Sequence, residues 1–291
     1  MSEDKTLANW NGVEMPLEEV RVSVLDRAFL FGDAVYEVIR LHAGVPFLFG
    51  DHMQRLERNL AKMQLTVDVA RLTSRLHQTL SHSGVKDGNI YIQVTRGEAP
   101  RTHRFPVPAP VPNELIYVKR LTSDRFADAR RDGAKVITVP DLRWKRCDIK
   151  SVNLLANCLA AQQAAEAGCD EAILVSEDGT LTEGTQTSLF GVQDGAILTA
   201  PLESNVLPGI TRGLVVKLAG IAAIPMVERG IPLSALSDLD ELFLTGTTAD
   251  ILPVTLVDGR PIGNGQVGPV TRRLVETFHE YLQSTLSELS N

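Results

Sequence analysis

The sequence has few cysteines and no spacing of them that suggests a metal or a disulfide framework. Its 291 residues include three cysteines, Cys147, Cys158 and Cys169. None stands in a CxxC pair or in the Cys/His spacing of a zinc site, and an odd number of thiols argues against a set of disulfides. We therefore expect no metal site and a protein of the reducing cytoplasm.

Long hydrophobic runs and an excess of basic residues are also lacking. No stretch approaches the ~20 apolar residues of a membrane-spanning helix. Residues 1–10 are polar and acidic where a signal peptide would be basic and then apolar. The net charge is -7, and Lys and Arg are dispersed along the chain, which gives no basic footprint for a polyanion. We expect a soluble protein that binds neither membranes nor nucleic acid.

The length favours two domains, each large enough to bury a core. In the first half, residues 35–40 alternate between apolar and polar, and Ala43-Gly44 leads into an apolar return strand at 45–49, which predicts a β-hairpin. Asp51 and Asp68 each precede a helical apolar pattern, so we predict them as N-caps of two amphipathic helices. Further strands are predicted at 89–95 and 114–119.

The pattern changes after a charged stretch that begins at Leu121. Short strands with Asp-Gly turns and an alanine-rich helix at 154–167 dominate the second half. Other predicted elements are strands at 135–139 and 171–175 and helices at 211–218 and 270–286. The predicted fold is mixed α/β (α+β): a small N-terminal α+β domain, residues 1–120, a linker, 121–126, and a larger domain rich in short strands, 127–291.

Lys150 is a candidate nucleophile. It lies in the segment Arg146-Cys147-Asp148-Ile149-Lys150-Ser151, just before the alanine-rich helix and beside apolar residues. Partial desolvation there would lower the pKa of its amine and favour nucleophilic chemistry. A solvated surface lysine fits the same local pattern, so the local sequence leaves both interpretations open.

Glu183 follows about thirty residues later, in Leu181-Thr182-Glu183-Gly184-Thr185. A carboxylate that faces the ring nitrogen of a pyridine-type cofactor keeps that nitrogen protonated, and the ring then acts as an electron sink. A surface turn is the alternative.

Two segments have the character of phosphate cradles. Ile210 and Thr211 open a helix after a Pro-Gly pair, so free backbone N–H groups and a hydroxyl face outward there. Gly246 and Thr247 directly follow an apolar strand. Arg55, on the first predicted helix, could add a bidentate guanidinium to the same phosphate. Ordinary caps, a strand-end turn and a surface ion pair are the alternatives.

Arg101 and His103 lie two residues apart on a loop that leaves a predicted strand. A guanidinium and an imidazole so placed can hold a carboxylate. Solvated loop residues are the alternative.

Taken in order, these segments resemble the class IV pyridoxal-phosphate aminotransferases, which have fold type IV. The resemblance runs from about Val20 to Thr277. It is carried by Asp26-Arg27, Phe31 to Glu37, the helix bearing Arg55, Lys150 to Asn153, Thr182-Glu183-Gly184, Gly209 to Arg212, and Thr245-Gly246-Thr247.

The resemblance implies a homodimer with its active site between domains and pyridoxal 5'-phosphate as cofactor. Lys150 would be the Schiff-base lysine and proton shuttle, and Glu183 would face the ring nitrogen. The residues implied to hold the cofactor's phosphate group are Arg55, Ile210, Thr211, Gly246 and Thr247.

Within the family the chain looks most like the D-amino acid aminotransferases. Two segments carry this likeness, Pro100-Arg101-Thr102-His103 and Arg143 to Lys150. It implies that Tyr36, Arg101 and His103 trap the substrate's α-carboxylate, the last two reaching toward the neighbouring subunit's site. The implied reaction is a ping-pong transamination in which D-alanine and 2-oxoglutarate give pyruvate and D-glutamate.

Other functions are compatible with the same motifs. The chain is similar in these respects to branched-chain L-amino acid aminotransferases and R-selective amine transaminases, and a non-catalytic dimer is a third alternative. Gln186, Ser188 and Gly246 depart from the family pattern around the phosphate, where a small residue, an asparagine and a serine are expected.

Overall fold

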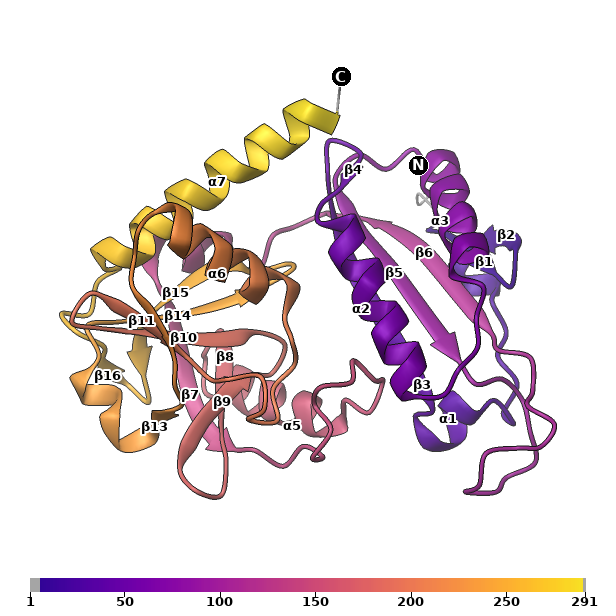
Figure 1. The fold of residues 1–291 in the computed structure, drawn as a ribbon, viewed down its shortest axis with the longest axis horizontal. Helices are drawn as coiled ribbons and strands as arrows, with labels where there is room; N and C mark the ends of the chain where they lie inside the picture. Colours follow the sequence, from indigo (N-terminus) through magenta and orange to yellow (C-terminus); the bar gives the residue numbers. More distant parts are fainter. Residues whose placement is uncertain (1–5, 290–291) are drawn as a thin grey trace. The chain divides into compact units, whose positions relative to one another are not determined.

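The computed structural model describes residues 6–289, which belong to two compact units (Figure 1). Unit 1 runs to Thr122 and also includes Ile149–Asn153, whereas unit 2 comprises Ser123–Asp148 and continues from Leu154. This differs from the continuous second domain predicted for 127–291, because the segment that carries Lys150 packs with unit 1. The polar residues 1–5, on which the expectation about a signal peptide partly rests, lie outside the described residues.

Unit 1 is a six-stranded antiparallel sheet in the order β2-β1-β6-β5-β3-β4. The strands are β1 (Leu7–Trp10), β2 (Val13–Pro16), β3 (Ala34–His42), β4 (Val45–Pro46), β5 (Gly88–Thr95) and β6 (Glu114–Arg120). Alternation along β3 buries Val35, Ile39 and Leu41 in one cluster. Leu56 of α2 (Phe49–Lys62) and Leu72 of α3 (Val69–Ser83) complete that cluster, so the two helices cover one face of the sheet.

The predicted hairpin and the first predicted helix are only partly correct. β4 ends at Pro46, Leu48 adopts the left-handed region at φ 54°, and α2 begins at Phe49. The prediction that 45–49 is a strand and that Asp51 is an N-cap is therefore wrong, because the N-cap is Leu48 and the helix starts three residues earlier. Asp68 is confirmed as the N-cap of α3, since its carboxylate accepts from Arg71 N at 3.0 Å.

The segment around Lys150 is attached to the start of β3. Tyr36 N donates to Lys150 O at 3.0 Å, and Val152 N donates to Ala34 O at 3.2 Å. Ser151 forms an isolated β-bridge with Val35. These bonds fix the backbone of Lys150 relative to β3. Unit 1 also contains the short helices η1 (Leu17–Glu19) and α1 (Arg27–Phe31).

Unit 2 contains a ten-stranded mixed sheet that closes on itself. Its order is β12-β11-β10-β14-β15-β7-β8-β9-β13 with β16 beside β15, and β9 also pairs with β10. The strands are β7 (Ala134–Pro140), β8 (Glu171–Val175), β9 (Thr180–Gly184), β10 (Ser188–Gln193), β11 (Ala196–Thr199), β12 (Met226–Glu228), β13 (Ile231–Pro232), β14 (Glu241–Gly246), β15 (Asp250–Val257) and β16 (Arg260–Pro261). Strands β7 to β10, β14 and β15 thus form a ring, and their side chains Val136, Ile173, Leu244 and Leu252 share one core.

Five helical segments accompany this sheet. They are α4 (Ala127–Asp132), α5 (Leu155–Glu166), α6 (Ile210–Ile221), η2 (Leu233–Asp238) and α7 (Pro269–Leu289). The predicted class, mixed α and β with short strands in the second part, is confirmed. The sequence missed α4, whose residues Ala-Asp-Ala-Arg-Arg-Asp offer almost no apolar period. Across the described part of the chain, every helix is too short or too polar to span a membrane.

Glu241 joins β14 to the beginning of α7. Its two carboxylate oxygens accept from Val270 N at 2.9 Å and from Thr271 N at 2.8 Å, which satisfies backbone donors that the first helical turn leaves free. A Cβ at Gly268 would lie 2.0 Å from Glu241 Cδ, so only glycine allows this approach. The buried carboxylate therefore acts as a cap supplied from a distant strand.

Replacing Glu241 with alanine should lower the free energy of unfolding by about 1–3 kcal/mol, because the variant leaves one buried and one partly buried N–H group without acceptors. Urea unfolding followed by circular dichroism measures this loss. Glu280→Ala, on the exposed face of the same helix, is the matched control and should change stability by less than about 0.5 kcal/mol. Equal effects of the two substitutions would show that the cap contributes nothing.

Candidate active site

Lys150 lies against the ring of Tyr36 in unit 1. Its Nζ atom is 4.2 Å from the centre of that ring, a distance at which an aromatic face attracts an ammonium group. The side chain of Tyr36 points to the sheet face opposite Glu37, because neighbours along a strand alternate. The structure thus brings two of the predicted site residues together.

Two further tyrosines support Tyr36 on the same face of the sheet. Tyr91 stacks on Tyr36 with ring centres 5.7 Å apart, and Tyr117 stacks on Tyr91 at 4.8 Å. Burial raises the pKa of both Tyr91 and Tyr117, so both phenols are neutral near pH 7. The row of rings limits the orientations open to Tyr36.

Arg55 forms a buried charge cluster with Glu37 and His52. Its Nε donates to Glu37 Oε1 at 2.7 Å and its Nη2 to Glu37 Oε2 at 2.8 Å, while His52 Nδ1 lies 2.8 Å from Glu37 Oε2. Burial by itself would raise the pKa of Glu37, but the charge of Arg55 and the bonds from both partners lower it to about 2. The alternative of a surface ion pair is therefore wrong, and contact of Arg55 with a phosphate stays a prediction.

Sequence motifs assigned no role to Glu37 or His52. A signal was present, since Glu37 falls on the apolar side of an alternating strand and such a carboxylate needs a buried partner. His52 and Arg55 are three residues apart on one helix and so share a face. Their contact with β3 depends on how α2 packs, which no local pattern shows.

Glu183 is buried in unit 2 and paired with Arg143. Arg143 Nη1 donates to Glu183 Oε1, and Leu207 N donates to Glu183 Oε2 at 3.0 Å. Arg143 is held in turn by Asp141, whose Oδ2 accepts from Arg143 Nη2 at 2.7 Å. Burial raises the pKa of Glu183, and the charge of Arg143 opposes that rise. The alternative of a surface turn is wrong, because Glu183 is 5% exposed.

Ser188 lies where the predicted cofactor-binding elements of unit 2 converge. It pairs with Glu183 across β9 and β10 and with Thr245 across β10 and β14. A Cβ at Gly209 would lie only 2.6 Å from Ser188 Oγ. The start of α6, with Ile210 and Thr211, and the end of β14, with Gly246 and Thr247, therefore lie near Glu183.

These elements fit a phosphate group. Within residues 6–289, no side chain caps α6, whose N-cap is Gly209 and whose first turn has no acidic residue, so its leading N–H groups and its dipole favour an anion. The hydroxyl of Thr245 is buried and has no hydrogen-bond partner among the described residues. Such donors suit phosphate oxygens.

Arg101 and His103 share one aromatic neighbour in unit 1. The guanidinium carbon of Arg101 is 5.3 Å from the centre of the Phe31 ring, and the His103 ring meets the same ring edge-on at 5.7 Å. Both side chains are exposed on their loop. The structure places the pair together, and their role toward a carboxylate stays a prediction.

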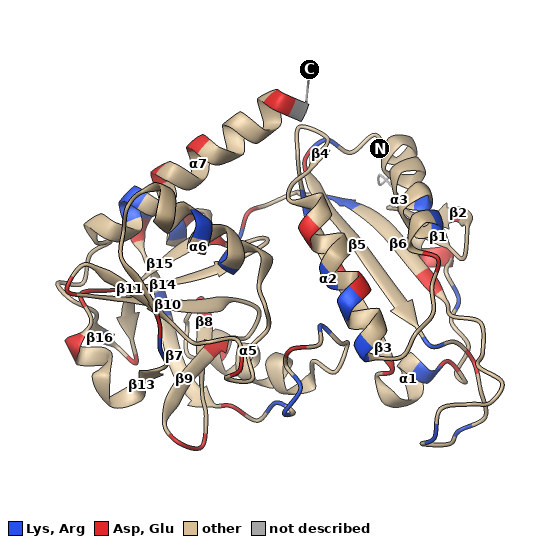
Figure 2. Ribbon diagram, in the orientation of Figure 1, with Lys and Arg blue, Asp and Glu red and all other residues tan. Residues whose placement is uncertain are grey.

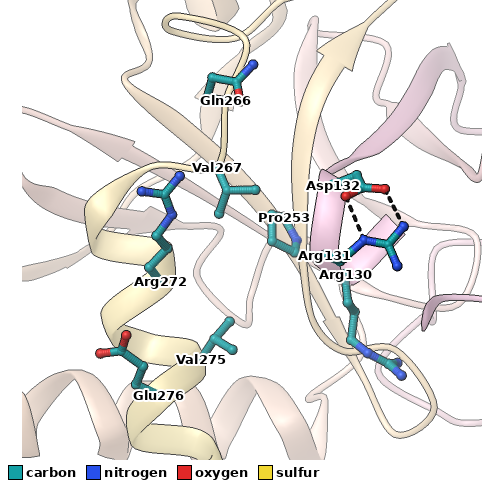
Figure 3. A pocket seen from close by; sticks show the side chains of 9 residues that line it. All are labelled: Arg130, Arg131, Asp132, Pro253, Gln266, Val267, Arg272, Val275 and Glu276. Atoms are coloured by element: carbon teal, nitrogen blue, oxygen red, sulfur yellow. Dashed lines mark hydrogen bonds and ion pairs between the residues drawn. The ribbon is translucent and has the colours of Figure 1, made fainter. Parts of the chain in front are cut away.

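A separate cavity of about 370 Å³ lies in unit 2 between α4, β15 and α7 (Figure 3). Its lining residues are Arg130, Arg131, Asp132, Pro253, Gln266, Val267, Arg272, Val275 and Glu276. Arg130 is paired with Asp124 and Arg131 with Asp132, so two of the three guanidinium groups are already neutralised. The cavity includes none of the predicted site residues.

Charge and metal-ligand patterns do not point to another kind of site. Basic and acidic residues are interspersed on both units, as α2 illustrates (Figure 2). Residues 6–289 contain no group of three or more His, Cys, Asp or Glu side chains that could hold a metal ion.

Comparison with known proteins identifies the family. The profile of the family "Amino-transferase class IV" matches residues 34–257, a span that includes Lys150, Glu183 and both segments predicted to bind a phosphate. The chain therefore belongs to the class IV aminotransferases, and the resemblance predicted from its motifs is confirmed.

Individual relatives agree with this family. The chain is 38% identical to the D-alanine aminotransferase of Staphylococcus haemolyticus over 279 residues, which cover 95% of this chain and 98% of that protein. It is also 38% identical to the enzyme of that name from Bacillus licheniformis, with 91% and 93% covered. Among solved structures, a branched-chain amino acid aminotransferase of Escherichia coli superposes with a TM-score of 0.87 at 27% identity, covering 95% of this chain and 94% of that one.

Replacing Arg143 with methionine should destabilise the protein by about 3–5 kcal/mol at pH 8, because it leaves a buried carboxylate without its counter-charge. Without Arg143, the pKa of Glu183 in the folded variant rises further above its value in the unfolded chain. At pH values between these two pKa values, the folded variant binds more protons than the unfolded chain. Stability of the variant therefore falls as pH rises. Urea unfolding at pH 5.5 and pH 8 should show the larger deficit at pH 8.

Arg143→Lys is the control, since it keeps the positive charge and should give a smaller deficit with little pH dependence. Equal deficits of Arg143→Met at the two pH values would contradict the assigned coupling.

Proposed function

We propose that this chain is a pyridoxal-phosphate-dependent D-amino acid aminotransferase that acts as a homodimer. The observation that carries the proposal is the buried Glu183–Arg143 pair beside the uncapped start of α6. A carboxylate held there suits a pyridine nitrogen, and the helix start suits a phosphate. Support for the D-amino acid substrate comes from the D-alanine aminotransferase relatives, which match nearly the whole chain.

Several of the predicted site residues would serve the cofactor in this proposal. Glu183, paired with Arg143, would hold the ring nitrogen of the cofactor. Ile210 and Thr211 donate to the phosphate group, together with Gly246 and Thr247. Arg55, held by Glu37, adds positive charge. When bound, pyridoxal phosphate supplies an electron sink that makes the α-proton of an amino acid acidic.

Lys150 moves the proton in the proposed reaction. Its Nζ would be the attachment point for the cofactor, and as a free amine it would accept the α-proton of the amino donor. Tyr36 limits the positions open to the amine of Lys150, because the face of the Tyr36 ring attracts the ammonium form of that amine. Lys150 would also return a proton, and the amino group removed from the donor would pass to a 2-oxo acid in the second half of the reaction. With D-alanine and 2-oxoglutarate the products are pyruvate and D-glutamate.

Arg101 and His103, with Tyr36, distinguish this proposal from the alternatives. A paired guanidinium and imidazole on an exposed loop suit an α-carboxylate, which an amine donor lacks. The structural likeness to branched-chain enzymes concerns the fold they share, at 27–28% identity. In the proposed dimer, the pair serves the site of the neighbouring subunit.

Lys150→Ala should abolish transamination of D-alanine, with turnover reduced by at least about 10⁴-fold, because the variant lacks both attachment point and base. A coupled assay of pyruvate formation measures this. Lys145→Ala, an exposed lysine of the same segment, is the control and should keep full activity. Near-normal turnover in Lys150→Ala would refute the assignment.

Arg101→Ala should raise KM for D-alanine by about 10- to 100-fold and leave the reaction of D-alaninamide within about 2-fold, since the amide lacks the charge that Arg101 binds. The half-reactions can be followed by the change in cofactor absorbance. Arg104→Ala, on the same loop and equally exposed, is the matched control. If both substrates respond alike to Arg101→Ala, the carboxylate role is wrong.

A further inference from the structure

The loop that carries Arg101 and His103 is fixed at its base. Arg27 N donates to Gly97 O at 3.0 Å, and Ala99 N donates to Leu25 O at 3.3 Å. Gly97 has φ +92°, and a Cβ there would lie 2.0 Å from Val111 O. The outgoing and returning parts of the loop therefore approach each other closely before the exposed residues begin.

The peptide between Arg101 and His103 is held by a buried arginine. Arg27 Nη1 donates to Thr102 O at 2.7 Å, and Arg27 Nε donates to Asp33 Oδ2 at 2.8 Å. Arg27 is 3% exposed. A bond from a charged donor in such a setting is stronger than one between neutral groups, so it limits how far this peptide can move.

A second buried arginine holds the loop on the other side of His103. Arg96 binds both carboxylate oxygens of Asp33, Nε to Oδ2 at 2.8 Å and Nη2 to Oδ1 at 3.0 Å, and donates to Met63 O at 2.7 Å. Its guanidinium carbon lies 3.6 Å from the centre of the Phe105 ring. Phe105 is 47% exposed, and the guanidinium carbon of Arg27 lies 6.0 Å from the centre of the same ring, so Arg96 is the nearer of its two guanidinium neighbours.

Phe31 completes the arrangement from α1. Its ring lies 4.7 Å from the guanidinium carbon of Arg27 and also contacts Arg101 and His103. The loop residues 101–105 are thus attached at three points: a carbonyl bound by Arg27, two side chains against Phe31, and an aromatic ring on Arg96.

We propose that Phe105, stacked on Arg96, is a positioning residue for Arg101 and His103, and that this contact sets the preference for amino donors with an α-carboxylate. The inference rests on the proposed function of the Arg101–His103 pair. Phe105 lies two residues beyond His103. Without the Phe105 ring, the loop loses its contact with Arg96. Arg101 and His103 must then become ordered when the carboxylate binds, and this ordering lowers the affinity for the amino donor.

The test compares D-alanine with D-alaninamide on the holoenzyme of Phe105→Ala. Loss of a stacking contact with a desolvated guanidinium corresponds to a change in KM of about 3- to 30-fold. We expect KM for D-alanine to rise by that factor, with kcat and the D-alaninamide reaction within about 2-fold of the parent. Phe105→Tyr keeps the ring on Arg96 and should restore the parent KM. Val107→Ala, at a fully exposed position of the same loop, is the matched control.

The outcomes separate this inference from the proposed function. If Arg101→Ala raises KM for D-alanine while Phe105→Ala does not, or if Phe105→Ala slows both donors equally, the positioning role is overturned and the carboxylate role stands. If Arg101→Ala itself has no selective effect, both are overturned. Adding Phe105→Ala to Arg101→Ala should raise KM by less than about 2-fold further, because the two residues act on one contact. Independent effects that multiply would contradict the inference.

Discussion

The backbone hydrogen bonds between the Lys150 segment and the start of β3 are the constraint on which the site of unit 1 depends. Tyr36 N binds Lys150 O, and Val152 N binds Ala34 O, so the lysine has the position of a short edge strand. Asp33, the residue directly before β3, forms ion pairs with Arg27 and Arg96. A shift of these few residues would therefore move the lysine, its aromatic neighbour and the anchored loop together.

Buried carboxylates paired with arginine recur in this protein. Glu37 is neutralised by Arg55, Asp33 by Arg27 and Arg96, and Glu183 by Arg143. Each pair costs desolvation energy, so such pairs are weak evidence for stability. Their benefit lies in geometry, because a planar guanidinium and a carboxylate fix each other's orientation. Glu37 and Glu183 differ in the sign of their pKa shift, since Arg55 and His52 both lower the pKa of Glu37, whereas Glu183 shares Arg143 with Asp141, whose charge raises the pKa of Glu183.

Local sequence patterns predicted the regular elements well where the period was strong. The alternation along β3 and the N-cap Asp68 match the structure. The same patterns failed at α4, which lacks an apolar period, and at Leu48, whose left-handed backbone starts α2 early. For the site, motif order singled out Lys150, Glu183 and the two segments predicted to bind a phosphate, and their roles stay predictions. It missed Arg143 and His52, because an arginine in a loop and a histidine on a helix carry no mark of their partners.

The sequence by itself determined the family, the class of fold and the order of the chemical groups, because these follow from residue types and spacings along one chain. Only the tertiary structure decided which charges meet. It placed Lys150 on Tyr36, Arg143 on Glu183 and Phe105 on Arg96, contacts that span 9 to 114 residues of sequence. A buried charge must find its partner wherever packing puts one, and packing is a property of the whole folded chain.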